Sequence, residues 1–132
     1  MAAMKDILVP LSPGELLDKI TILRIKAARM ADATKVRNVR LELSLLENTW
    51  RDSGCASFDV SSDERALQTV NEKLWVVEDL IREKEAARAF DTEFIELART
   101  VYIANDERAA IKKRVNLQLG SRIVEEKSYK SY

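Results

Sequence analysis

The chain of 132 residues contains no histidine and one cysteine. The absence of histidine excludes a Ser-His-Asp triad, a Cys-His pair, histidine metal sites and the usual general base at neutral pH. The single cysteine, Cys55, excludes an internal disulfide and a cysteine-rich zinc site. Cys55 also lies in a polar stretch with no histidine to activate it, which argues against a catalytic thiol. We therefore expect neither a metal nor another cofactor.

Glycine and proline are scarce, with three and two residues, whereas 46% of the chain is hydrophobic and 33% is charged. This composition is typical of long helices and argues against a turn-rich sandwich or barrel. The 22 basic and 22 acidic residues cancel, so the chain lacks the basic excess of a nucleic-acid binder. No apolar run is long enough to span a membrane, and residues 1–5 do not resemble a signal peptide. We expect one domain, residues 1–132, in the cytoplasm.

The clearest helix start lies at residues 12–15, Ser-Pro-Gly-Glu. The serine can cap, the proline suits the first helical position and the glutamate completes a capping box, so a helix is predicted over residues 13–30. Ile22 and Ile25 lie roughly opposite its main apolar stripe, which makes the helix apolar on two faces. Such a helix lies either in the centre of a bundle or against another subunit. The main stripe consists of Leu16, Leu17, Ile20, Leu23 and Ala27.

A second helix is predicted to begin at Asp32 or Thr34, because both residue types are good caps. Its apolar residues are spaced alternately three and four apart and form a regular seam: Val36, Val39, Leu43, Leu46 and Trp50. The stretch 52–62 is rich in Ser, Gly and Asp, which indicates a loop. A third helix then begins at Ser62 or Asp63.

The third helix is predicted to end within residues 86–90, and Asp91 to begin the fourth. Asn and Asp in residues 104–106 could cap a new helix, so the fourth helix either continues through this point or breaks there. After a break, residues 107–119 would form a fifth helix. Gly120 is expected as the C-cap.

The predicted fold is an all-α, antiparallel bundle of four or five helices with short extended ends. The tail, residues 121–132, is expected to pair with residues 6–10 as a short two-stranded ribbon. Trp50 and Trp75 are expected in the core or at an interface. Together with the two-faced first helix, they suggest a homodimer.

The most informative pattern is a group of polar residues on an apolar helix face. In a continuous helix from residue 94 to 119, four polar side chains lie within about 60° of the apolar stripe: Asn105, Arg108, Lys112 and Asn116. Burying such groups is costly unless something pairs with them. One interpretation is a pocket for a carboxylate or phosphate, which Arg24 of the first helix could join.

The alternative interpretation of the same residues is structural. Arg108 would pair with a carboxylate on a facing helix, for instance Glu78 or Glu85, while Lys112 extends outward and Asn105 caps a helix. If the pocket belongs to an enzyme, the reaction would depend on electrostatic stabilisation, with Glu78 or a tyrosine as the acid or base. Both interpretations remain open from the sequence.

Other charged groups are expected to be less informative. Asp18, Lys19 and Thr21 follow the first capping box, and we expect a charged first turn there rather than an anion site. The acidic residues of the third and fourth helices do not have the paired spacing of magnesium-binding helices, so we expect solvated faces and ion-pair partners: Glu72, Glu78, Asp79, Glu93 and Glu96.

Three motifs resemble those of a family of small bacterial proteins of unknown function. They are PLSPGELLDKITIL from Pro10, NDERAAIKKRVN from Asn105 and EEKSY from Glu125. The resemblance covers nearly the whole chain and implies no activity, cofactor or catalytic residue. Members of that family are sometimes encoded near glycosyltransferase genes, which implies a link to cell-surface polysaccharide synthesis.

Two functions follow as expectations. The first is a non-enzymatic interaction or assembly module, accessory to polysaccharide synthesis, that forms a homodimer or binds a partner protein. The second is a protein that binds, or acts on, a small anionic metabolite through the basic pocket in the bundle. Neither involves nucleic acid or a membrane span.

Overall fold

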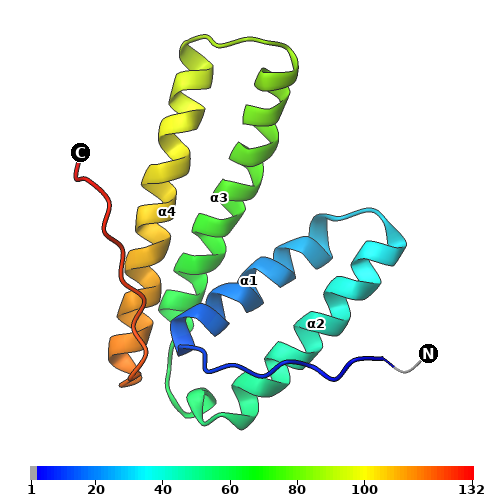
Figure 1. The fold of residues 1–132 in the computed structure, drawn as a ribbon, viewed down its shortest axis with the longest axis vertical. Coiled ribbons are helices and arrows are strands. Elements are labelled where there is room, and N and C mark those ends of the chain that lie inside the picture. The colour runs from blue at the N-terminus through cyan, green and yellow to red at the C-terminus, as the bar shows by residue number, and fades with distance from the viewer. Residues whose placement is uncertain (1–2) are drawn as a thin grey trace.

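The structure, a computed structural model, describes residues 3–132 and is all-helical over that range. Helices α1 and α2 form one hairpin, α3 and α4 form a longer one, and the two hairpins cross obliquely (Figure 1). A short 3₁₀ turn, η1, connects them. The bounds are α1 Pro13–Arg29, α2 Ala33–Asp52, η1 Cys55–Ser57, α3 Ser61–Ala86 and α4 Thr92–Gln118. The predicted all-α bundle with short extended ends is confirmed.

Three of the helices begin as their capping residues predict. Ser12 Oγ accepts from the backbone N–H of Glu15 at 3.2 Å, with Pro13 in the first turn. Asp32, rather than Thr34, caps α2, and Asp91 caps α4; each accepts a backbone N–H three residues later, at 3.0 and 2.9 Å. By contrast, α3 begins at Ser61, one residue before the predicted start, with no side-chain cap from the preceding Val60.

Of the two alternatives for the fourth helix, the structure confirms the continuous one. Helix α4 is continuous through Asn105, so the bundle has four helices and not five. The Asn105 side chain donates to the carbonyl of Val101 at 3.0 Å, within the helix, instead of capping a new one. Its neighbour Ala104 is fully buried against α3, and this packing outweighs the local preference of Asn and Asp for a helix end.

The predicted ribbon between residues 6–10 and the tail was wrong. Residues 3–132 contain no strand. The tail runs along α4, whereas the N-terminal segment leaves the start of α1 in another direction (Figure 1). Ion pairs described below attach the tail to α4 through side chains, so backbone pairing is not required to position it.

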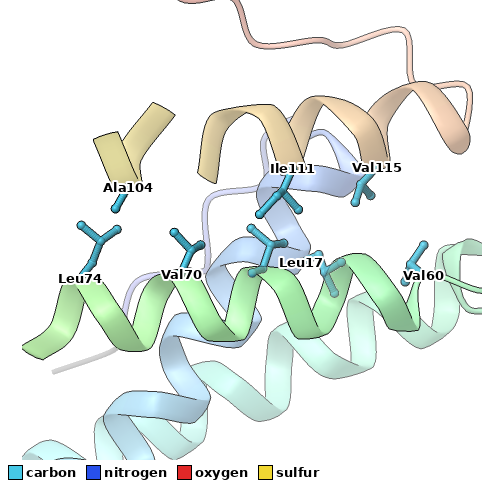
Figure 2. Close-up of a cluster of buried hydrophobic side chains, with 8 residues drawn as sticks. Leu17, Val60, Val70, Leu74, Ala104, Ile111 and Val115 are labelled. Atoms are coloured by element: carbon cyan, nitrogen blue, oxygen red, sulfur yellow. The ribbon is translucent and has the colours of Figure 1, made fainter. Parts of the chain in front are cut away.

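The core lies where α1 meets α3 and α4. Figure 2 shows side chains of all three helices pointing toward one another. The buried cluster consists of Leu17, Val60, Leu67, Val70, Leu74, Ala104, Ile111 and Val115. Helix α2 has no buried residue and packs chiefly against α1, with its predicted seam half-buried. Leu17 anchors α1 in this cluster, and the next residue, Asp18, therefore lies where α1 meets α3 and α4.

Candidate functional site

Arg108 forms a buried ion pair with Asp18 of α1. Its Nε donates to Asp18 Oδ1 at 2.9 Å, and its Nη2 contacts Asp18 Oδ2 in the second arm of a bidentate pair. Asp18 is fully buried. The Asn71 side chain donates to Asp18 Oδ1 at 2.9 Å and to Thr21 Oγ1 at 3.1 Å. The pKa of Arg108 lies above its ordinary value, because the hydrogen bonds to Asp18 outweigh the effect of burial.

The carboxylates expected to pair with Arg108 lie elsewhere. Glu78 pairs with Arg82 on its own helix, and Glu85 forms no ion pair within residues 3–132. Glu15 gives α1 the expected acidic first turn, whereas Asp18, three residues later, is fully buried and pairs with Arg108. The structural interpretation of Arg108 was therefore right in kind, but it named the wrong carboxylate.

Arg24 does not join the polar group on α4. It pairs with Glu64 of α3 and, at 3.2 Å, with Glu47 of α2. These contacts place it beside a separate small groove that Leu17 and Trp50 also line. Arg24 thus connects three helices on another side of α1.

Lys112 is buried between α1 and the tail rather than extending outward. Its Nζ lies 2.5 Å from Glu15 Oε2 and 3.0 Å from Glu125 Oε2. Burial lowers the pKa of Lys112, but the hydrogen bonds to these two carboxylates outweigh it, and the pKa is raised. Glu125 also accepts from Lys127 at 2.8 Å, and hydrogen bonds from Lys127 and Lys112 lower its pKa to about 2.

Asn116 completes the polar group by fixing a close approach of α1 to α4. Its Oδ1 accepts from the backbone N–H of Gly14 at 2.7 Å. A Cβ at position 14 would lie 2.3 Å from the Lys112 carbonyl oxygen, so only glycine fits there. Asn105, in contrast, is exposed, and its Oδ1 lies 3.5 Å from Arg108 Nη1.

A pocket of about 510 Å³ lies between α4 and the tail, and we call it the tail pocket. Its charged lining consists of four cations, Arg108, Lys112, Lys127 and Lys130, and one carboxylate, Asp106.

Three tyrosines also line the tail pocket: Tyr102, Tyr129 and Tyr132. The hydroxyl of Tyr132 donates to Asp106 at 2.5 Å, and the Tyr132 ring packs edge-on against Tyr102 with centroids 5.3 Å apart. These contacts hold the far end of the tail on α4 and close one side of the pocket.

Residues 7–132 match a protein family of unknown function, DUF6165. The chain belongs to this family. No curated protein and no solved structure matches it. Within residues 3–132, no helix is long and apolar enough to cross a membrane, and no cluster of acidic or cysteine side chains is arranged to hold a metal ion.

The three motifs quoted from the sequence meet in space at this site. The first supplies Gly14, Glu15 and Asp18, the second supplies the polar residues of α4, and the third supplies Glu125, Lys127 and Tyr129. The polar stripe on α4 identified only the residues of the second motif. The carboxylates of α1 were missed because a charged first turn is common on exposed helices. The tail residues were missed because a tail without periodicity gives no sign of where it packs.

Proposed function

We propose that this protein binds a small organic anion in the tail pocket. The observation that supports this best is the charge of the lining, with four cations against one carboxylate. The volume, about 510 Å³, falls within the range of pockets for small-molecule ligands. The proposal is one of binding and gives no catalytic role to Glu78, which does not line this pocket.

The internal ion pairs leave donors free for a ligand. Nε and Nη2 of Arg108 donate to Asp18, so Nη1 remains available to donate to a ligand. Its one other contact is the long one to Asn105 Oδ1. Lys130 forms no ion pair within residues 3–132 and lines the pocket. Together these groups can donate to a carboxylate or phosphate while the tyrosines cover an apolar or ring-bearing part of the ligand.

The test compares ligand-induced thermal stabilisation of the wild type and of Lys130→Ala. The ligands are inorganic phosphate, dicarboxylates, nucleoside phosphates, sugar phosphates and nucleotide sugars. A ligand at about 100 times its Kd stabilises the folded state by roughly 2.7 kcal/mol, which is a shift of several degrees in Tm. We expect this shift in the wild type and a clearly smaller shift in Lys130→Ala.

Lys113→Ala is the matched control. Lys113 is a lysine of α4 that pairs with the tail through Glu126 at 3.2 Å, but it does not line the tail pocket. It should keep the full response. A failure of every anion at millimolar concentration to stabilise the wild type, or an equal shift in Lys130→Ala, would contradict the proposal. A response confined to sugar phosphates or nucleotide sugars would support a cytoplasmic role in polysaccharide synthesis.

A second candidate function is a non-enzymatic assembly module that works as a homodimer. It is favoured by apolar surface that the single chain leaves uncovered. Met4, Ile7, Leu8 and Val9 are exposed, Leu8 to 91%, and α2 buries no residue. Sedimentation equilibrium at micromolar concentration should show a dimer, and a monomer at every concentration up to about 100 µM would rule this candidate out.

A further inference from the structure

A second hollow lies between the two hairpins, on the other side of Arg108 from the tail pocket. This hairpin groove, of about 350 Å³, has apolar walls from Ile22 and Ile25 of α1 and from Leu74 and Trp75 of α3. Ile22 and Ile25 are the second apolar face of α1 that the sequence showed. The single chain thus leaves part of that face open to the groove.

The rim of the hairpin groove on the α3 side is acidic. Glu78 and Asp79 line it together with Arg82, and Glu78 pairs with Arg82. Arg108, the other cation of the lining, is paired with Asp18, so Asp79 is the charge of the lining without an ion pair within residues 3–132. The end of the α3–α4 hairpin around this rim also carries a net negative charge, because residues 78–99 include seven carboxylates and four cations. An occupant of the groove should therefore present apolar side chains flanked by cations.

The outer face of α2 has these properties. Leu41 and Leu45 lie one turn apart, opposite the seam that faces α1, and are 64% and 46% exposed. Arg37 lies one turn before Leu41 on the same face, and Arg40 lies beside it; both are exposed, and neither forms an ion pair within residues 3–132. Around them, residues 26–40 carry five cations and one carboxylate.

We propose that the hairpin groove receives the outer face of α2 from a second copy of this chain, reciprocally, in a two-fold dimer. The inference rests on the assembly candidate above and is independent of anion binding. Each copy carries one groove and one complementary α2 face, and a closed two-fold arrangement uses the same pair of surfaces on both copies. The groove lies between α1 and α3, in the angle at which the two hairpins cross (Figure 1).

Charge reversal on each side tests this arrangement. In sedimentation velocity, Arg37→Glu/Arg40→Glu and Glu78→Lys/Asp79→Lys should each weaken dimerisation at least tenfold, because like charges then face each other. An equimolar mixture of the two variants should recover a heterodimer through one restored pair of surfaces. Far-UV circular dichroism checks that both variants remain helical, which is expected because three of the four positions are exposed and Glu78 is only half-buried.

The control is Arg65→Glu/Lys73→Glu. Both residues are exposed on α3, lie outside the hairpin groove and form no ion pair within residues 3–132. This variant should dimerise like the wild type. A dimer that no charge reversal weakens would overturn the proposed interface and leave the assembly candidate standing. A wild type that stays monomeric would overturn both, while the tail pocket would still be judged by its own ligand test.

Discussion

Removing Arg108 should leave the carboxylate of Asp18 buried without a counter-ion. Breaking a buried ion pair by deleting one partner costs roughly 3–5 kcal/mol. Asp18 is fully buried, whereas the Arg108 side chain is 28% exposed. Arg108→Ala should therefore cost about 4–5 kcal/mol, and Asp18→Asn about 3 kcal/mol, because water can still reach the unpaired guanidinium.

Urea unfolding followed by circular dichroism at pH 7 measures the cost of each substitution. The control is Asp18→Asn/Arg108→Met, which removes both charges at similar volume and should recover most of the lost stability. A cost below about 1 kcal/mol for Arg108→Ala at pH 7 would refute the argument that burial of this charge dominates.

The close approach of the helices, the tail ion pairs and the continuity of α4 can also be tested. Gly14→Ala should lower the unfolding free energy by about 2–3 kcal/mol, because the new Cβ meets the Lys112 carbonyl oxygen; a neutral result in urea unfolding would contradict the packing. In an NMR titration, the carboxyl group of Glu125 should have a pKa of about 2, and Lys127→Ala should move it toward 4.5. Since the folded pKa is lowered, its contribution to stability is present above pH 4.5 and is lost as the pH falls toward 2. Asn105→Ala should be neutral or stabilise by up to about 0.5 kcal/mol, since Ala is the better residue within a helix, whereas a loss of about 1 kcal/mol in thermal unfolding would show a capping role.

Local chemistry predicted the helices of this fold well, because caps and apolar periodicity act within a few residues. Ser12, Asp32 and Asp91 begin their helices as expected. The prediction was poorest where tertiary contacts override local preference. Asn105 and Asp106 are good capping residues, yet the burial of the preceding Ala104 keeps the helix continuous.

The candidate site could be predicted only in part, for a related reason. The stripe on α4 showed that Arg108 needs a partner, but the partner is 90 residues away in sequence. Which carboxylate reaches it depends on how α1 crosses α4, and this crossing is set by the contact of Gly14 with the α4 backbone. No periodicity within one helix contains that information.

The ion pairs also change how binding at the tail pocket should be tested. Asp18 holds Arg108, while Glu15 and Glu125 hold Lys112, so these cations are positioned before any ligand arrives. Their removal would disturb the crossing of α1 and α4, and a lost ligand response could then reflect lost folding. Lys130 has no such structural partner within residues 3–132 and lies on the exposed tail. Its substitution changes the charge of the pocket while leaving the core intact, which makes it the residue that separates a binding site from a structural network.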